Sequence, residues 1–377
     1  MFSDTGGGHR AAARALDGAL RQIAPEMKIS WCDPLIGQGR AVARRLSSLY
    51  PTIIKRSPPT WGAIFHASNT APSFTAICTT LRAQIRPVLR RELEATDPDV
   101  ILSVHPLLNH ITTGLLRRDR RRRALMTVVT DLVDVHRGWA CRAADLVVVP
   151  TREAELAALR WGVAGDRLRL LGMPVDLRFR PPEPGETALI RRRLGLDEAR
   201  PTVLVAGGGE GSGGLLDQVR AVSERRHPWQ VIAVCGRNES LRRRLMGLHL
   251  ETPTLVLGFV DDMPDLMRAS DLALGKAGPG AIAEALTTGL PLVLTSYLPG
   301  QERGNVRFVT ESGVGRYAPR PDRMVAAVSE LLGPDASART EMRRRAEALV
   351  RPGAAVDIAR ACLQLGARYS AASHASR

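Results

Sequence analysis

Three glycine-rich segments of the chain each form a turn that leads into a helix. They span residues 6–9 (GGGH), 207–214 (GGGEGSGG) and 275–284 (GKAGPGAIAE). Glycine lets the backbone turn sharply and approach a ligand closely. The helix that follows directs free N–H groups and a positive dipole end towards that ligand. The three segments therefore predict anion binding, and residues 207–214, which follow the apolar run TVLVA, are suited to a diphosphate.

His9 opens the first of these helices. An imidazole at this position can act as a general base. Transfer of a sugar to an alcohol needs such a base, because a hydroxyl group is a poor nucleophile until its proton is removed. We therefore predict that His9 is catalytic, with Asp4 or Asp131 as candidates to orient its ring. The alternative interpretation is a glycine-rich turn with an incidental surface histidine.

The segment 207–214 also contains Gly209-x-Gly211-x-x-Gly214, which matches the dinucleotide fingerprint. That fingerprint requires an acidic residue at the end of the next strand. Here the next strand ends in Val-Cys-Gly-Arg at 234–237, so NAD is disfavoured and NADP, bound through Arg237, stays an alternative. The predicted diphosphate- and nucleotide-binding residues are Gly8, Gly208, Gly209, Gly211, Ser212, Gly258, Phe259, Gly278, Pro279, Gly280 and Glu284.

A polar loop at 299–305 (PGQERGN) follows the apolar run 290–295, at the strand end where α/β proteins bind ligands. Gln301 and Glu302 can hydrogen-bond sugar hydroxyls, and Tyr297 or Phe259 can pack on a base. The DxD sequence at 97–99 precedes a strand, where Asp and Pro are ordinary turn residues. We therefore predict no metal site and no cofactor, and expect helix dipoles and loop amides to offset the leaving-group charge.

Short apolar runs alternate with longer helical stretches, which indicates βαβ units and parallel sheets. A linker rich in Pro and Gly at 178–186 separates two such sets. We predict an α/β protein with two Rossmann-like lobes whose parallel sheets face a central ligand cleft. Only Met1 and Phe2 precede the turn SDTGGGH, so the first strand is missing from this sequence. We expect that the true start lies upstream; the alternative is that the sheet lacks this strand. The predicted domains are 1–177, a linker region 178–199, 200–350, and a C-terminal helix with a frayed tail at 351–377. The predicted strands are 100–104, 125–130, 146–149, 168–171, 202–206, 230–234, 254–257 and 290–295.

The chain is strongly basic, with 53 Lys and Arg against 38 Asp and Glu and a net charge of +15. Such a surface suits nucleic acid, an anionic lipid or a phosphate-bearing substrate. No nucleic-acid motif occurs and aromatic residues are few, which ranks nucleic acid last. The five cysteines form no paired motif, which favours a reducing compartment. No apolar run is long enough for a membrane span, so any membrane contact is expected at the surface.

Residues 37–73 combine basic and apolar side chains in a pattern typical of a membrane-facing segment, including Arg56 and Trp61. Basic residues attract anionic headgroups, and apolar residues can enter the interface. The alternative interpretation is an ordinary loop and helix covering the lobe.

Six segments in order resemble one family: SDTGGGH, VHPLLNH, VTDLVDVHRGW, GGGEGSGG, GKAGPGAIAEAL and PGQERGN. They are similar to the monogalactosyldiacylglycerol synthases and bacterial diacylglycerol glucosyltransferases, and more distantly to MurG. The resemblance covers about residues 3–317 and implies an inverting GT-B hexosyltransferase, a peripheral membrane enzyme of glycolipid biosynthesis. It implies transfer of galactose or glucose from a UDP-sugar to diacylglycerol, without a metal.

The same resemblance implies roles for individual residues. His9 would deprotonate the acceptor, the loop 207–214 would hold the diphosphate, Glu284 the ribose, and Gln301 with Glu302 the hexose. His105 and Trp139 match positions linked in the plant enzymes to activation by anionic lipid. We expect the protein at the cytoplasmic face of the plasma membrane. The alternatives are a MurG-like transfer of N-acetylglucosamine to a polyprenyl lipid, and an NADP-dependent oxidoreductase.

Overall fold

The structure is a computed structural model that describes residues 1–3, 7–35, 57–117, 119, 121–209, 211 and 213–375. The chain divides into two compact units, which are described separately. The first unit comprises Met1–Leu177, Leu298–Gln301 and Gly353–Arg377, and the second comprises Arg178–Tyr297 and Glu302–Pro352.

The first unit is built on a parallel sheet with strand order β1-β2-β3-β4. Helices cover both of its faces, and the central strands β2 and β3 are nearly continuous apolar runs that are buried on both sides. The elements are α1 (Gly8–Ile23), α3 (Pro58–Ser68), α4 (Ala71–Thr96), β1 (Val100–Ser103), α5 (Pro106–Leu116), β2 (Ala124–Val128), η1 (Arg137–Trp139), β3 (Leu146–Val149), α6 (Arg152–Arg160), η2 (Gly165–Arg167), β4 (Leu168–Leu170) and α15 (Ala354–Ala375).

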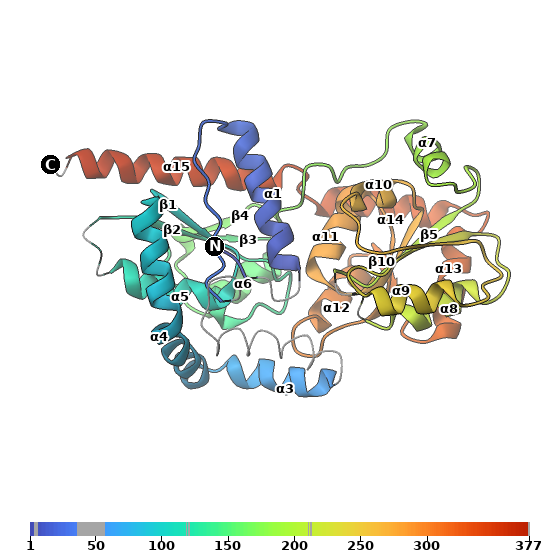
Figure 1. Cartoon of the computed structure of the whole chain (residues 1–377), viewed down its shortest axis with the longest axis horizontal. Helices are drawn as coiled ribbons and strands as arrows, with labels where there is room; N and C mark the ends of the chain where they lie inside the picture. Colours follow the sequence, from blue (N-terminus) through green and yellow to red (C-terminus); the bar gives the residue numbers. More distant parts are fainter. Residues whose placement is uncertain are drawn as a thin grey trace. The chain divides into compact units, whose positions relative to one another are not determined.

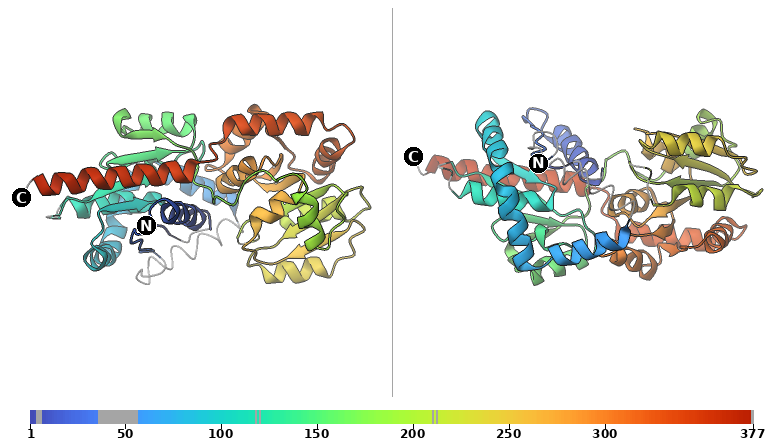
Figure 2. Two further views of the ribbon diagram at one scale, coloured as in Figure 1. Left: turned by 90° about the horizontal axis from the view of Figure 1, so that it is seen from above. Right: turned by 60° about the horizontal axis from the view of Figure 1, so that its bottom comes forward.

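Alternate residues of the first sheet enter two different cores. Leu125 and Val147 pack in a core with Ile85 of α4 and Ile111 of α5. The intervening Met126 lies in the other core, which is closed by α1 and α15. The C-terminal helix α15 runs beside α1 and packs on β1 and β2 (Figure 1, Figure 2). The last helix of the chain therefore completes the core of the first unit.

The chain start lies against the same sheet. The Met1 carbonyl accepts a hydrogen bond from the Val104 amide at 3.0 Å, and the Phe2 amide donates to Cys32 at 3.2 Å. Among the described residues before α1 no strand is formed.

The second unit contains a six-stranded parallel sheet with order β10-β9-β8-β5-β6-β7, the doubly wound arrangement of a Rossmann fold. The two parallel α/β units confirm the predicted fold class. The elements are α7 (Glu186–Arg193), β5 (Thr202–Ala206), α8 (Leu215–Ser223), β6 (Gln230–Val234), α9 (Glu239–Met246), β7 (Thr254–Leu257), α10 (Met263–Arg268), β8 (Leu272–Lys276), α11 (Pro279–Thr288), β9 (Leu292–Ser296), α12 (Arg303–Glu311), β10 (Gly315–Tyr317), α13 (Pro321–Leu332) and α14 (Ser337–Leu349).

Strand β8 was not predicted from the sequence, although it lies in the middle of this sheet beside β5. Its sequence, LALGK, contains a glycine and a lysine and gives a weak strand signal. Gly275 is needed there, because a Cβ atom would lie 2.9 Å from the Ala206 carbonyl oxygen of β5. The glycine that obscured the strand thus allows it to approach its neighbour.

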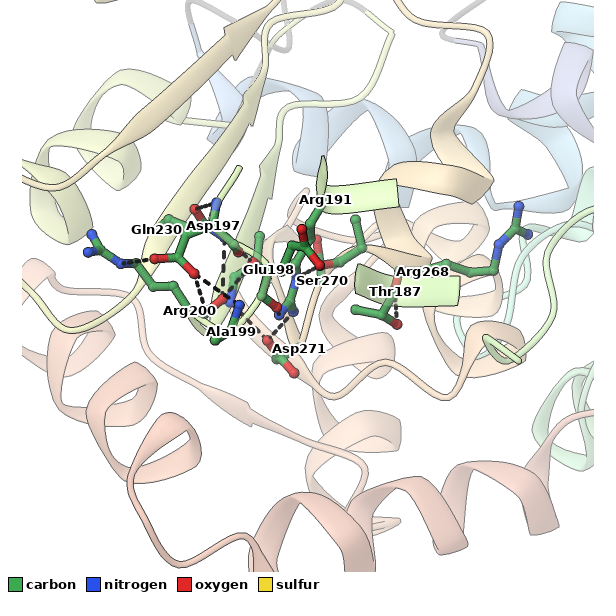
Figure 3. Close-up of polar contacts among 12 residues, drawn as sticks. Thr187, Arg191, Asp197, Glu198, Ala199, Arg200, Gln230, Arg268, Ser270 and Asp271 are labelled. Carbon is green, nitrogen blue, oxygen red and sulfur yellow. Dashed lines mark hydrogen bonds and ion pairs between the residues drawn. The ribbon is translucent and has the colours of Figure 1, made fainter. Parts of the chain in front are cut away.

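A polar network anchors α7 to the second unit at the amino ends of the strands (Figure 3). The buried Arg191 donates to the Ala269 carbonyl at 2.8 Å and to Asp271 at 2.6 Å. Asp271 also accepts from the Thr202 amide of β5 at 2.8 Å. Gln230 of β6 bonds with the backbone of Asp197 in the loop after α7. These bonds lie at the amino ends of the strands, whereas the glycine-rich loops follow the carboxyl ends.

Candidate functional site

His9 lies in the first turn of α1, directly after Gly8. The N-cap residue Gly7 has φ 86° and supplies no side chain to the first N–H groups of the helix. The His9 Nδ1 lies 3.3 Å from the Thr130 hydroxyl, in the segment that follows β2. The start of α1 and the segment after β2 therefore jointly position the His9 ring.

Two further rings surround His9 in the first unit. The His105 ring centre lies 4.7 Å away and that of Trp139 lies 5.9 Å away. Trp139 is only 1% exposed, and its indole N–H donates to the Asp131 carboxylate at 2.7 Å. Asp131, predicted as a possible partner of His9, thus bonds the indole that packs on His9. The structure brings together His9, His105 and Trp139, which are far apart in the sequence.

The protonation of His9 is disfavoured in this environment. Burial lowers the pKa of His9 to about 4, and a hydrogen bond with the Val104 backbone raises the pKa by a smaller amount. Burial, and secondarily the nearby His9, hold the pKa of His105 well below its usual range. Both rings are therefore neutral near pH 7, and a neutral imidazole can accept a proton.

In the second unit, the loop after β5 packs backbone to backbone on the loop after β6. A Cβ atom at Gly211 would lie 2.2 Å from the Cys235 carbonyl oxygen, and one at Gly236 would lie 2.5 Å from that of Gly209. The Arg237 amide donates to the Gly209 carbonyl at 2.9 Å. Glycine at these positions is therefore required by close approach as well as by the positive φ angles of Gly211 and Gly236.

The same edge of the sheet carries a stacked cation and ring. The Arg237 guanidinium lies 4.6 Å from the centre of the Phe259 ring, which is 48% exposed and follows Gly258 after β7. Parallel strands expose their carboxyl ends at one edge, so these loops and the glycine loop 207–214 share that edge. A planar base and a phosphate suit this combination of ring, cation and loop amides.

The third glycine segment begins α11, with Gly278 as its N-cap and Pro279 and Gly280 in the first turn. Glu284 follows one turn later on the same helix. Beside Gly278, Lys276 at the end of β8 forms an ion pair with Glu302, whose exposure is 2%. Glu302 was predicted to bind a hexose, and the structure places its carboxylate against this lysine. Gln301 is grouped with the first unit and Glu302 with the second.

The remaining predicted residues fall in other places. Trp61 is partly buried on α3. Arg56 and Ser212 lie outside the described residues, as does most of the predicted membrane-facing segment. Asp97 and Asp99, the rejected DxD pair, form ion pairs with Arg121. No group of three potential metal ligands occurs among the residues that the structure describes.

Sequence reasoning missed several side chains around these sites. Thr130 was not proposed, although it is the last residue of the predicted strand 125–130, where site residues are common. Arg237 was considered only for NADP, and Lys276 was not proposed as a site residue. Their ring and carboxylate partners lie 22 and 26 residues away along the chain, so the pairs become visible only in the fold.

Family models match both parts of the chain. Residues 9–175 match the monogalactosyldiacylglycerol (MGDG) synthase model, and residues 202–351 match the glycosyltransferase family 28 C-terminal domain. A probable monogalactosyldiacylglycerol synthase from Glycine max is 33% identical over 375 residues, which is 95% of this chain and 69% of the relative. Monogalactosyldiacylglycerol synthase 1 of Arabidopsis thaliana has the same identity and coverage.

Solved structures share the fold. MurG from Acinetobacter baumannii has a TM-score of 0.60 at 16% identity, covering 95% of this chain and 96% of that one. A sucrose-phosphate synthase from Thermosynechococcus elongatus has a TM-score of 0.52 at 21% identity, covering 77% of each chain. At these identities the likeness concerns the GT-B fold.

The prediction of a location at the plasma membrane is wrong. The relatives from soybean, Arabidopsis and spinach are all named as chloroplastic proteins. In the part of the chain that the structure describes, no helix has both the length and the apolar character needed to cross a membrane.

Proposed function

The chain belongs to the monogalactosyldiacylglycerol synthase family, and we propose that it transfers galactose from UDP-galactose to diacylglycerol. It is thus a glycosyltransferase whose product is a galactolipid, as the names of its relatives imply. The choice of galactose over glucose rests on those names. The choice of UDP as carrier rests on the nucleotide-type loops of the second unit.

The observation that carries the proposal is the placement of His9 at the start of α1, within contact of Thr130 and flanked by Trp139. In the proposed step, His9 accepts the proton of the diacylglycerol hydroxyl, and the oxygen forms a bond to C1 of the hexose. The bond between C1 and the UDP oxygen breaks, and UDP leaves with the electron pair. One displacement of this kind inverts the configuration at C1.

The second unit supports the departure of UDP. The loop 207–214, the start of α11 and Arg237 offer N–H groups and positive charge for a diphosphate. Phe259 offers a ring face for the base, and Glu284 a carboxylate for the ribose. We propose that these groups meet the leaving-group charge without a metal ion, so activity should survive chelation by EDTA. Gln301 and the Lys276–Glu302 pair are proposed to contact the hexose.

A product assay tests this function. Purified protein is mixed with vesicles of diacylglycerol and phosphatidylglycerol, and UDP-galactose or UDP-glucose is added in separate tubes. Mass spectrometry of the extracted lipids should show a hexosyl-diacylglycerol with UDP-galactose. Product only with UDP-glucose would show that the donor is UDP-glucose and not UDP-galactose. Absence of product with either donor, but product from a polyprenyl-diphosphate acceptor and UDP-N-acetylglucosamine, would support the MurG-like alternative.

Replacement of the proposed base separates chemistry from binding. His9→Ala should lower kcat by about 100-fold or more, as expected for loss of a general base. The affinity for UDP, measured by calorimetry, should stay within twofold of wild type. Loss of UDP binding together with activity would contradict the assignment of His9 as the base.

A further inference from the structure

The chain makes a tight turn at residues 298–301, between β9 and α12. The Gln301 amide donates to the Leu298 carbonyl at 3.3 Å, which closes the turn. Pro299 is its second residue, and Gly300, with φ 82°, is its third. Proline at the second position and a positive φ at the third are typical of a type II turn. The sequence LPGQ therefore forms a stiff turn that ends at Gln301.

This turn belongs to the first unit, where it packs on α3. A Cβ atom on Gly62 of α3 would lie 2.8 Å from the Cβ atom of Pro299. In the opposite direction, a Cβ atom on Gly300 would lie 2.9 Å from the ring of Phe65, which is buried. Each side thus places a glycine against a ring of the other side. The helix and the turn approach so closely that neither glycine has room for a side chain.

The place of Gln301 depends on this packing. Strand β9 ends at Ser296 and α12 begins at Arg303, so Gln301 lies in neither element. The hydrogen bonds of a sheet or helix therefore do not fix it, and the turn with its contact on α3 does so. Close-packed interfaces transmit small displacements, so one added methyl group at the contact must move the turn.

The side chain of Gln301 ends in an acceptor that the protein leaves unused. Its Oε1 is buried and has no hydrogen-bond partner among the described residues. A buried amide oxygen without a partner costs stability, and a ligand that donates a hydrogen bond removes this cost. A hexose carries several hydroxyl groups that can donate. Diacylglycerol carries one, which His9 deprotonates in the proposed step, so the hexose is the better match.

We propose that Gly62 and Phe65 are positioning residues that hold the turn 298–301 so that the Gln301 amide oxygen accepts a hydrogen bond from a hydroxyl of the donor hexose. This inference rests on the proposed function, in which Gln301 contacts the hexose. Displacement of the turn moves this oxygen away from the hydroxyl. The loops proposed to bind the nucleotide are unchanged, so the loss concerns UDP-galactose and not UDP.

The structure offers a matched pair of glycines for a test. Gly62→Ala adds one methyl group at the point where Pro299 must move. Gly18→Ala is the control, because Gly18 lies inside α1 of the same unit and a Cβ atom there has no heavy atom of the described residues within 4 Å. Both changes replace a helical glycine by alanine, which favours the helix. Gly300→Ala disturbs the same contact from the side of the turn, should Gly62→Ala fail to fold.

The first measurement is binding of UDP and of UDP-galactose by calorimetry. Gly62→Ala and Gly300→Ala should bind UDP-galactose about tenfold more weakly than wild type, the effect of one lost hydrogen bond. Their affinity for UDP should stay within twofold, and Gly18→Ala should match wild type for both ligands. An equal loss of affinity for UDP and UDP-galactose, or no loss for either, would overturn the proposal.

A double-mutant cycle shows whether Gly62 acts through Gln301. Gln301→Ala removes the acceptor oxygen and should itself weaken binding of UDP-galactose. Gly62→Ala should then change the affinity by less than twofold in the Gln301→Ala background, because the group that it displaces is gone. Losses that add in the double variant would show that Gly62 affects the donor by another route, and the proposal would fail.

The kinetic measurement separates this inference from the proposed function. In the vesicle assay, Gly62→Ala should raise the KM for UDP-galactose about tenfold and leave the KM for diacylglycerol within twofold of wild type. A higher KM for diacylglycerol alone would place the acceptor at Gln301 and overturn the inference. If wild type binds UDP-galactose but makes no product, the proposed function fails, and the binding measurements still decide on Gly62. If wild type does not bind UDP-galactose, both fail.

Discussion

The environment of His9 sets the pH range in which a base at this position can work. His9 must be neutral to accept a proton, and burial lowers its pKa to about 4. We therefore expect kcat/KM to stay level from pH 7 down to about 5 and to fall by half near pH 4. The measurement is kcat/KM between pH 3.5 and 8, with return to pH 7 after each exposure to exclude irreversible unfolding. A fall centred near pH 6.5 would show that His9 titrates as an exposed histidine.

Gly211 gives a second prediction at the scale of a single residue. Its Cβ atom would lie 2.2 Å from a backbone oxygen, and its φ is 57°. Gly211→Ala should therefore separate the loops after β5 and β6 and weaken UDP binding more than tenfold in calorimetry. The control is Gly247→Ala, where the nearest contact of a Cβ atom is 3.6 Å and φ is −85°. Equal UDP affinity of the two variants would show that the loop contact does not shape the nucleotide site.

At the scale of elements, the anchoring of α7 by a buried arginine can be tested through stability. Arg191 is 5% exposed and bonds Asp271 and two backbone carbonyls. Arg191→Met leaves Asp271 without this buried partner, so the free energy of unfolding should fall by about 3 kcal/mol. The adjacent Arg192 pairs with Glu198 at the surface, and Arg192→Met should hardly change stability. The free energies of unfolding of the two variants are measured by urea denaturation. Similar losses of stability in both variants would contradict this prediction.

The elements that the sequence predicted correctly are those with a strong local signal. Parallel strands buried on both faces are runs of Val, Ile and Leu, and β3 and β5 were found with the bounds that the structure has. Strand β8 was not predicted, because Gly275 and Lys276 at its end weaken the strand signal. The same limit applies to the sites. His9 and the glycine loops could be proposed as site residues from residue type, whereas the contacts of His9 with Thr130, His105 and Trp139 depend on chain segments brought together by folding.

For the whole molecule, the histidines of the first unit predict unequal sensitivity of the two units to acid. His9, His105, His110 and His136 belong to the first unit, and burial is the main cause of the lowered pKa of each. The pKa of His136, for example, is lowered to about 4. Between pH 6.5 and 4 the unfolded chain binds protons that the folded unit does not, so stability falls as the pH is lowered. His9 and His136, each with a pKa lowered to about 4, can each contribute up to about 3 kcal/mol to this loss.

Hydrogen exchange at pH 7 and pH 5, corrected for intrinsic rates, measures the acid stability of each unit separately. Peptides from β1 to β3 should lose protection at pH 5, while those from β5, β6 and β8 should keep it. In the second unit the pKa of His227 is also lowered, but this group is largely outside the core. Arginine partners lower the pKa of several carboxylates, for example that of Glu341 to about 2. These carboxylates stay charged at pH 5, so their contribution to stability is lost only in stronger acid. Equal loss in both units would therefore show that the histidines of the first unit do not control its acid stability.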